Sequence, residues 1–109
     1  MIGFYAYHAD HRGRYGDNWR WDEQGWLEPG RWHLIEQEIK LNHPERADGQ
    51  LRAWVDGRLV YENTALRVRN NDSLKVRKVW MNVYYGGRTP SARDLFLDFD
   101  DLWIGLERP

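Results

Sequence analysis

The chain contains no cysteine among its 109 residues, so disulfides contribute nothing to its stability and give no indication of the redox compartment. It also lacks any apolar run near the roughly 20 residues that a membrane-spanning helix needs. The N-terminus does not have the charged and then apolar build of a signal peptide, so the compartment stays unknown. Sixteen basic residues balance 17 acidic ones without a long block of either sign. The sequence therefore predicts neither a nucleic acid partner nor a membrane partner.

The sequence offers enough apolar surface for one small domain. A length of 109 residues leaves room for one domain, residues 1–109, with a modest core. Seven tryptophans and a net charge of −1 favour a folded chain over a disordered one. Thirteen of the sixteen basic residues are arginine, which pairs well with planar carboxylates, although a codon bias explains this excess equally well.

Residues 50–63 carry the clearest local pattern, that of a β-hairpin. From Leu51 to Val55 apolar residues alternate with larger or polar ones, as in a strand with one buried face. Asp56 and Gly57 then supply the positive φ angles of a tight turn, and a second β-rich run follows. We therefore predict strand, turn and strand in this order.

Other segments also show strand patterns, and none is a convincing helix. Residues 3–9 form an aromatic strand that places Tyr5 and Tyr7 on one face. Residues 31–42 fit a helix by the spacing of Ile35 and Ile39, and a strand by the alternation of their neighbours. The remaining expected elements are a loop over 10–30 with a short strand near Trp19, a turn over 44–49, a short strand over 66–69, a turn over 70–73, and long strands over 76–85 and 95–104. Six or seven strands predict an all-β antiparallel sandwich or half-barrel.

Strand parity predicts two surfaces for such a fold, although a register slip of one residue would exchange them. One surface is concave and polar and is formed by Tyr5, Tyr7, Arg52, Trp54, Lys78, Asn82 and Tyr84. The other is the core, formed by Ile35, Ile39, Leu51, Val55, Val79, Val83 and Phe99. If the polar surface binds a ligand, we expect an anionic sugar that pairs with Arg52 and Lys78 and stacks on Trp54 or Trp80.

No metal site and no cofactor is predicted, with calcium as the one alternative. His8, Asp10 and His11 carry ligand atoms, but a metal site needs three or four converging groups, and a solvated loop explains them better. Asp98 and Asp100 could hold calcium together with loop carbonyls. The more frequent use of such a pair is to keep a strand soluble.

Three stretches of the chain resemble the C-terminal half of the polysaccharide lyase family 14 domain: GRWHLIEQEIKLN, ADGQLRAWVDGRLV and NVYYGGRTPSARDLFLDFDDLWIG. The matching features are Trp32, Glu36, Asn42, Asp48-Gly49, Trp54, Asp56-Gly57, Arg67, Gly86-Gly87 with an aromatic residue before them, Asp94 and Phe99-Asp100. Their order and spacing extend over nearly the whole chain. The family fold is a jelly roll related to the concanavalin-A-like lectins and glucanases, so the resemblance implies this form of β-sandwich.

Active members of this family cleave uronic-acid polysaccharides such as alginate or glucuronan by β-elimination. The resemblance implies that Tyr5 and Tyr7 lie in the cleft as catalytic residues, and that an acidic polysaccharide is the partner. The family also uses a lysine from a Gly-Gly-Lys segment and an arginine on an upstream strand, and neither has a counterpart in this sequence. Whether the chain is an enzyme therefore stays open, and a non-catalytic carbohydrate-binding or assembly module is the alternative.

Substrate contacts are expected from the polar surface, at Arg52, Trp54, Lys78, Trp80, Asn82 and Tyr84. A secreted or periplasmic location would follow if the chain were part of a lyase.

A sandwich of this kind occupies about 200–250 residues, roughly twice the present length. We expect either a fragment or natural truncation, or a reduced sandwich that a partner copy completes. A homodimer is expected to use the tryptophan-rich loop over residues 19–26, because large aromatic side chains dominate interface cores. The competing expectation is a monomer in which this loop covers the sheet.

Overall fold

The computed structural model describes residues 2–108, and its contacts divide the chain into two units. Unit 1 comprises residues 1–75 and unit 2 comprises residues 76–109. All strands of the described chain lie in unit 1. The single domain expected from the length stays a prediction.

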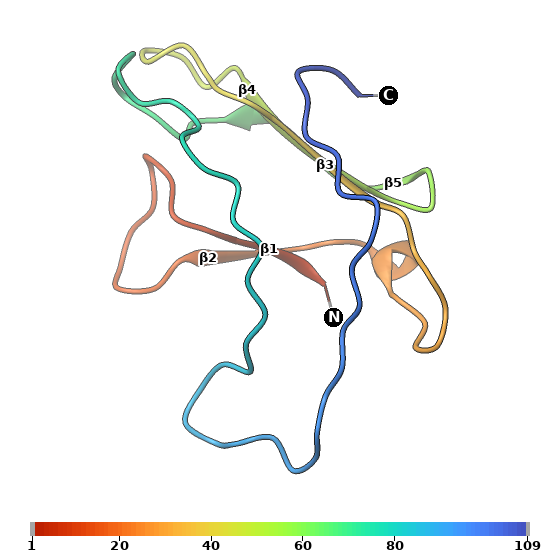
Figure 1. Ribbon diagram of the computed structural model, residues 1–109. Coiled ribbons are helices and arrows are strands. Elements are labelled where there is room, and N and C mark those ends of the chain that lie inside the picture. The colour runs from red at the N-terminus through yellow and green to blue at the C-terminus, as the bar shows by residue number, and fades with distance from the viewer. Residues whose placement is uncertain (1, 109) are drawn as a thin grey trace. The chain divides into compact units, whose positions relative to one another are not determined.

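Unit 1 contains two antiparallel sheets with one turn of 3-10 helix between them in the chain (Figure 1). The first sheet pairs β1 with β2, and the second has the strand order β3-β4-β5. The elements are β1 (Gly3–Ala6), β2 (Asp17–Arg20), η1 (Glu23–Gly25), β3 (Ile35–Lys40), β4 (Gly49–Val55) and β5 (Arg58–Leu66). The predicted all-β antiparallel class is confirmed, as is the short strand near Trp19. No helix of the described chain has the length and apolar character to cross a bilayer.

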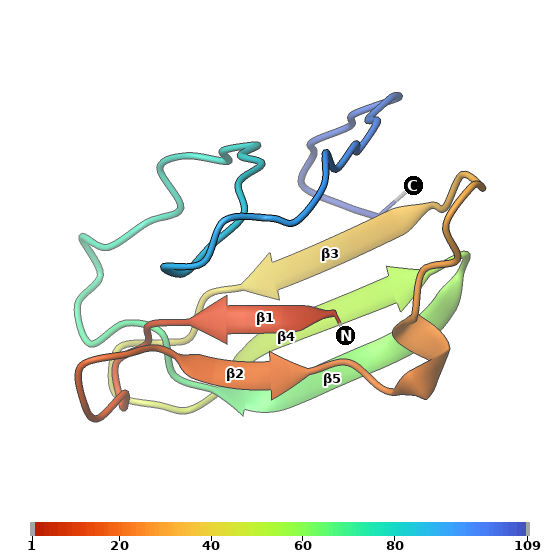
Figure 2. The same cartoon turned by 90° about the horizontal axis from the view of Figure 1, so that it is seen from below.

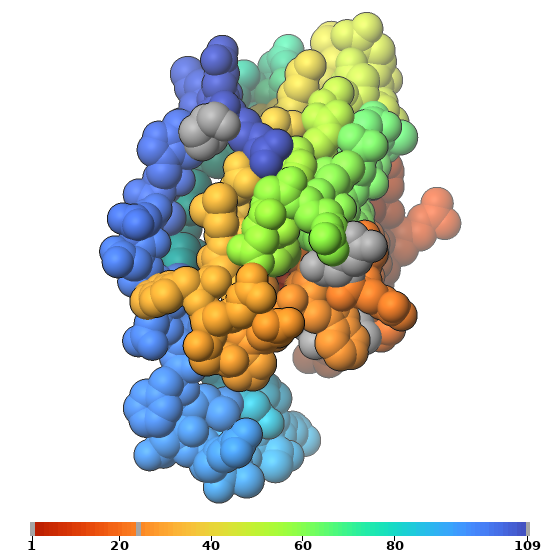
Figure 3. Space-filling view, turned by 90° about the vertical axis from the view of Figure 1, so that its right-hand side faces the viewer, coloured from red at the N-terminus to blue at the C-terminus, as the bar shows by residue number. Residues whose placement is uncertain are grey.

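The β4–β5 hairpin forms as predicted. Asp56 and Gly57 take φ angles of 51° and 80°, in the left-handed region that a two-residue turn between twisted strands requires. The Asp56 carboxylate fastens this turn to the segment before β3, because it accepts hydrogen bonds from the Leu34 amide at 2.9 Å and from His33 Nδ1 at 2.8 Å. In Figure 3 the orange segment between β2 and β3 lies against the green hairpin. The His33 hydrogen bond, followed by that of the Leu34 amide, lowers the pKa of Asp56.

Acid is expected to weaken the hydrogen bonds that the Asp56 carboxylate accepts from His33 and Leu34, and so to destabilise the fold. A carboxyl group whose pKa is lower in the folded chain than in the unfolded chain stabilises the fold only while it is ionised. The contribution of Asp56 is therefore complete above the ordinary aspartate value of about 4 and is lost as the pH falls through the lowered pKa. We expect the urea midpoint to fall with pH in this range, and to fall less steeply in Asp56→Asn, because asparagine tolerates the positive φ but carries no charge.

Asp48 is a second carboxylate whose ionisation makes the stability depend on acid pH, in wild type and in Asp56→Asn alike. Its pKa is also lowered, chiefly by the hydrogen bond from the His43 amide, so it keeps part of the acid dependence in the Asp56→Asn variant. Identical pH profiles of the urea midpoint in wild type and variant would show that Asp56 does not anchor the hairpin.

The two sheets of unit 1 pack against each other through a small apolar core (Figure 2). The buried core cluster consists of Trp21, Ala53, Val55 and Val60. Phe4 of β1 connects the sheets, since its ring centroid lies 5.4 Å from that of Trp21 and 5.2 Å from that of Tyr61 on β5. Because Phe4 points inward, the odd-numbered residues beside it point outward.

β3 lies at the edge of its sheet, and this explains the exposure of two predicted core residues. Ile35 pairs with Val55 and Ile39 with Leu51, so these side chains share the core face. Val55 and Leu51 are buried, whereas Ile35 and Ile39 are 42% and 48% exposed. The predicted parity is therefore confirmed, but the predicted burial of the two isoleucines is wrong, because β3 has a neighbour on one side only.

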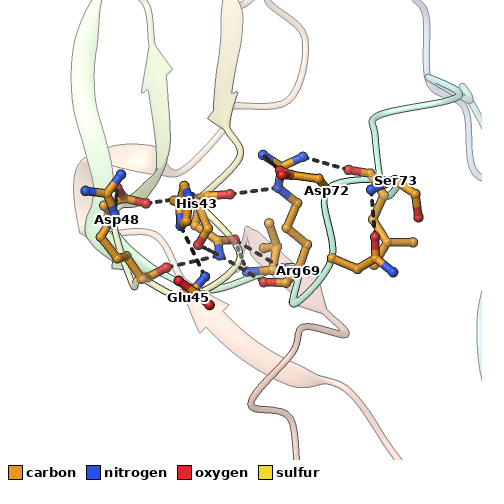
Figure 4. A network of polar contacts seen from close by, with 11 residues as sticks. His43, Glu45, Asp48, Arg69, Asp72 and Ser73 are labelled. Carbon is orange, nitrogen blue, oxygen red and sulfur yellow. Dashed lines mark hydrogen bonds and ion pairs between the residues drawn. The ribbon is translucent and has the colours of Figure 1, made fainter.

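The short strand predicted over residues 66–69 is wrong, because β5 ends at Leu66 and the next amides bond to a side chain. Asn42 Oδ1 accepts hydrogen bonds from the amides of Val68 at 2.9 Å and Arg69 at 3.1 Å. Arg69 Nε donates to the Asn42 carbonyl at 2.7 Å, and Figure 4 shows Arg69 next to His43 in this network. Side-chain hydrogen bonds thus replace a strand ladder at this point.

Unit 2 does not contain the two long strands that alternation predicts over residues 76–85 and 95–104. Among its described residues, 76–108, no strand forms. Val79, Val83 and Phe99, expected in the core, are all more than half exposed. Alternation alone is not sufficient, since a strand also needs a neighbour for its N–H and C=O groups. The predictions of both strands and of these three core residues are therefore wrong.

Candidate active site

Tyr5 and Tyr7 lie side by side on the outer side of the β1–β2 sheet and form the centre of the candidate site. The Tyr5 and Tyr7 side chains are 55% and 62% exposed. The side chain of Phe4, the residue before Tyr5 on β1, points the other way and packs against the core. Their hydroxyl oxygens are 3.3 Å apart, and their rings meet edge to face with centroids 5.5 Å apart. The predicted shared face is confirmed. Because a phenol both donates and accepts, the two hydroxyls can share a proton.

The loop between β1 and β2 contacts both tyrosines. The Gly16 amide donates to the Tyr5 hydroxyl at 2.9 Å. The His11 ring lies 5.1 Å from the Tyr7 ring, and His11 Nε2 contacts the Tyr15 carbonyl oxygen. The hydrogen bond with Tyr7 raises the pKa of Tyr5 most, and loss of solvent raises it further, whereas the Gly16 amide lowers it. The loop therefore contacts both rings and acts on the ionisation of Tyr5.

A cavity of about 340 Å³ opens beside Tyr5 and contains two residues that sequence reasoning missed. The strand register places Asn18 opposite Tyr5 and Arg20 opposite Gly3, so these side chains share the outer face. Within the described chain the Arg20 side chain forms no ion pair. Tyr7 is not among the residues that line this cavity, so the guanidinium lies near Tyr5 alone. A guanidinium without an ion pair suits an anionic ligand. The only signal in the sequence was the short strand near Trp19, because the register across a ten-residue loop is not readable from composition.

Arg52 lies on the polar face of β4, but protein groups already occupy it. Its Nε donates to Glu62 at 2.7 Å, and its Nη1 donates to Glu38 at 2.8 Å and to Gln50 at 2.7 Å. Hydrogen bonds to Glu62 and then Glu38 raise the pKa of Arg52. Two protein carboxylates therefore already balance the charge of Arg52, which makes it a weaker candidate for a uronate than the sequence suggested. Trp54 lies two residues further along the same face.

The other predicted substrate contacts are exposed side chains of unit 2: Lys78, Trp80, Asn82 and Tyr84. Lys78 Nζ lies 6.0 Å from the ring centroid of Trp80, the outer limit of a cation–π contact. The single concave surface expected from seven side chains of both units stays a prediction.

The three residues considered as metal ligands near the N-terminus contact other protein groups. His8 Nε2 lies 2.7 Å from Asp17 Oδ2, Asp10 pairs with Arg67, and His11 contacts a backbone carbonyl. Within the described residues, no group of three or more histidine and acidic side chains converges.

The same holds for Asp98 and Asp100, which were considered as calcium ligands. Asp100 Oδ1 accepts a hydrogen bond from the Asp101 amide at 2.8 Å, and no third acidic or histidine side chain joins the pair in the described part of unit 2. Calcium takes six to eight oxygen ligands, so the side chains present supply only part of such a shell.

Comparison with known protein families gives a match over most of the chain. The family model described as polysaccharide lyase 14 matches residues 15–95, a range that includes Asn18, Arg20 and the whole β3–β5 sheet. Tyr5 and Tyr7 lie outside the matched range. No curated protein and no solved structure matches the chain.

Proposed function

The chain belongs to the polysaccharide lyase 14 family, and we propose that it binds uronic-acid polysaccharides such as alginate or glucuronan on the outer face of the β1–β2 sheet. The observation that carries the proposal is the exposed hydroxyl pair of Tyr5 and Tyr7, together with a cavity that Tyr5 and Arg20 line. The pair offers a proton donor and a proton acceptor at one place, and the arginine offers charge for a carboxylate.

β-Elimination is the reaction that this arrangement supports. It needs a base for the C5 proton of a uronate, positive charge or N–H donors for the carbanion next to the carboxylate, and an acid for the leaving oxygen. In this proposal Tyr5 and Tyr7 supply base and acid, and Arg20 holds the carboxylate. Asn18 adds a neutral donor on the same face of the sheet.

A second candidate is a carbohydrate-binding module that does not cleave its ligand. Arg20 is the only cationic residue of β1 and β2, and none of the three lysines of the chain lies in these strands. With less positive charge to stabilise a carbanion, the exposed rings of Tyr5 and Tyr7 would serve mainly to stack on sugar rings.

Incubation with alginate and with glucuronan separates the two candidates. Cleavage is expected to raise the ultraviolet absorbance, because β-elimination creates a C4–C5 double bond next to the carboxylate. Tyr7→Phe removes one hydroxyl and keeps the ring, so we expect the rate to fall about 10²–10⁴-fold with little change in affinity. Binding by the wild type without any product would support the module that does not cleave.

Arg20→Ala tests how the ligand is held. We expect affinity for polyuronates to fall about tenfold or more, as for other hydrogen bonds to charged groups, and affinity for neutral glucans to stay unchanged. Arg58→Ala is the matched control, since Arg58 is an exposed arginine at the start of β5 in the other sheet. Equal losses in both variants, or equal affinity of the wild type for neutral and uronate oligosaccharides, would contradict the assignment.

A further inference from the structure

A second cavity of unit 1, of about 260 Å³, lies where the segment between η1 and β3 meets the turn of the β4–β5 hairpin (Figure 3). It shares no lining residue with the cavity beside Tyr5. Trp26 lines it, and its side chain is 63% exposed. In the described part of the chain no other aromatic ring contacts the Trp26 ring. Pockets for drug-sized ligands measure about 300–1,000 Å³, so this cavity has room for one small ligand or for one unit of a longer chain.

The polar wall of the cavity is held in place by His33, whose side chain is 8% exposed. With the proton on Nδ1, His33 donates to Asp56 Oδ2 at 2.8 Å, and its Nε2 accepts from the Glu28 amide at 3.0 Å. Arg31 connects the same two acidic residues, since it donates to Glu28 Oε2 at 3.2 Å and to Asp56 Oδ2 at 3.5 Å. Both carboxylates are therefore positioned before any ligand arrives, which lowers the entropic cost of binding.

The charges that line this cavity balance, because Glu28 and Asp56 lie opposite in sign to Arg31 and Arg58. Arg58 forms no ion pair with any described residue, so its N–H groups can donate to a ligand. The Glu28 side chain is 73% exposed and can accept. Balanced charge gives an anion no net attraction, whereas a hydroxyl group both donates and accepts and so suits this lining. The cavity beside Tyr5 differs, since no acidic residue lines it.

We propose that this second cavity binds a neutral hexopyranose unit of a polysaccharide. The C–H face of the sugar ring packs on Trp26, and its hydroxyl groups bond to Arg58 and Glu28. An aromatic side chain with a few fixed polar groups is the usual composition of a small-molecule site. Membership of a polysaccharide lyase family favours a sugar over other neutral hydroxyl compounds. The site is separate from the uronate-binding face proposed above and does not rest on it.

Titration of the full chain labelled with nitrogen-15 tests the proposal. The probes are cellohexaose and mannohexaose, which are neutral, and a mannuronate hexamer, which is anionic. The indole N–H resonance of Trp26 is assigned with Trp26→Phe. We expect at least one neutral hexamer to shift this resonance and the mannuronate hexamer to leave it in place. A resonance that neither neutral hexamer shifts, or that mannuronate shifts as far, would overturn the proposal.

Calorimetry with the neutral hexamer that binds measures what the indole contributes. We expect Trp26→Ala to lower the affinity about tenfold or more, and Trp26→Phe to lower it less, because phenylalanine keeps a smaller ring. Trp32→Ala is the matched control, since Trp32 is a 67% exposed tryptophan of the same segment that does not line the cavity. Unchanged affinity in both Trp26 variants, or an equal loss in Trp26→Ala and Trp32→Ala, would also overturn the proposal. The lyase assay uses polyuronates alone, so the proposed function and this site can fail separately.

Discussion

Replacing Asn42 by alanine is expected to lower the free energy of unfolding of unit 1 by about 3–5 kcal/mol. Asn42 is fully buried, with an exposed fraction of 0%. Its Nδ2 donates to the carbonyl oxygens of His43, Arg46 and Arg69 at 2.7, 3.1 and 2.9 Å, and its Oδ1 accepts from two amides. Its two N–H groups are shared among three carbonyl oxygens, so one side chain contacts five backbone groups from two segments that are far apart in the sequence.

The size of the effect follows from what alanine leaves behind. Each buried backbone group that loses its only partner costs about 1–3 kcal/mol, although water reaches some of these groups after the change. We expect Asn42→Asp to be destabilised as well. A carboxylate can still accept hydrogen bonds from the two amides, but it has no N–H group to donate to the three carbonyl oxygens, which it would repel. Small domains have a total stability of about 5–15 kcal/mol, so either variant removes a large part of it.

Asn71→Ala is the matched control for Asn42. Asn71 Oδ1 accepts one local hydrogen bond, from the Ser73 amide at 2.7 Å, at the surface of a turn. We expect its loss to change the stability by less than about 1 kcal/mol. Urea unfolding followed by tryptophan fluorescence gives both numbers, and similar midpoints for the Asn42 and Asn71 variants would show that the Asn42 network does not stabilise the fold.

Local patterns were sufficient to predict the parts of the fold that depend on neighbours in sequence. The Asp56-Gly57 turn follows from two residues that tolerate positive φ, and the pairing of Tyr5 with Tyr7 follows from the period of a strand. The choice between helix and strand for residues 35–40 did not follow, because periods of two and 3.6 both fit six residues. The β4 strand decides it, since it offers residues 35–40 a partner along their whole length.

The polar contacts of the site depend on residues far apart in sequence, and these were not predictable. Parity places Arg52 on the polar face, but its partners Glu38 and Glu62 lie on two other strands, so only the register shows that its guanidinium is engaged. For Arg20 the register adds a candidate where it removed one for Arg52. Arg20 becomes a candidate for ligand binding only once Gly3 is known to lie opposite it on β1. Asn42 is a further case, because its partners at Val68 and Arg69 are 26 and 27 residues away.

Trp21 and Trp26 differ in exposure within residues 19–26, the segment in which a dimer contact was expected. Trp21 is 5% exposed and belongs to the core cluster, where it packs edge to face against Phe4. Trp26 is 63% exposed. The third tryptophan of the segment, Trp19, is partly buried and stacks on Tyr61 of β5. Residues 19–26 therefore cover the sheet with two tryptophans and present Trp26 to solvent, where a partner could contact it. The homodimer stays a prediction, which light scattering of wild type and Trp26→Ala tests.

Trp21→Ala is expected to lower the free energy of unfolding by about 3–5 kcal/mol, as is usual when a large aromatic side chain is removed from a core. Gly25 packs closely on Trp21, with a hypothetical Cβ at 3.0 Å from Cβ of Trp21, so the surrounding backbone cannot easily fill the cavity. Trp26→Ala is the control and should change the stability by at most about 0.5 kcal/mol. Far-ultraviolet circular dichroism in urea is the measurement, because both variants remove a fluorophore.

Trp21→Phe separates the apolar packing of the ring from its polar atom. Trp21 Nε1 is buried without a hydrogen-bond partner in the described structure, and an unpaired buried donor costs about 1–3 kcal/mol. Phenylalanine loses part of the apolar contact but also removes this donor, so we expect it to cost well under half of the loss seen with alanine. A phenylalanine variant as unstable as the alanine variant would mean that Nε1 has a partner, most simply a buried water, and that the indole is held by a hydrogen bond as well as by packing.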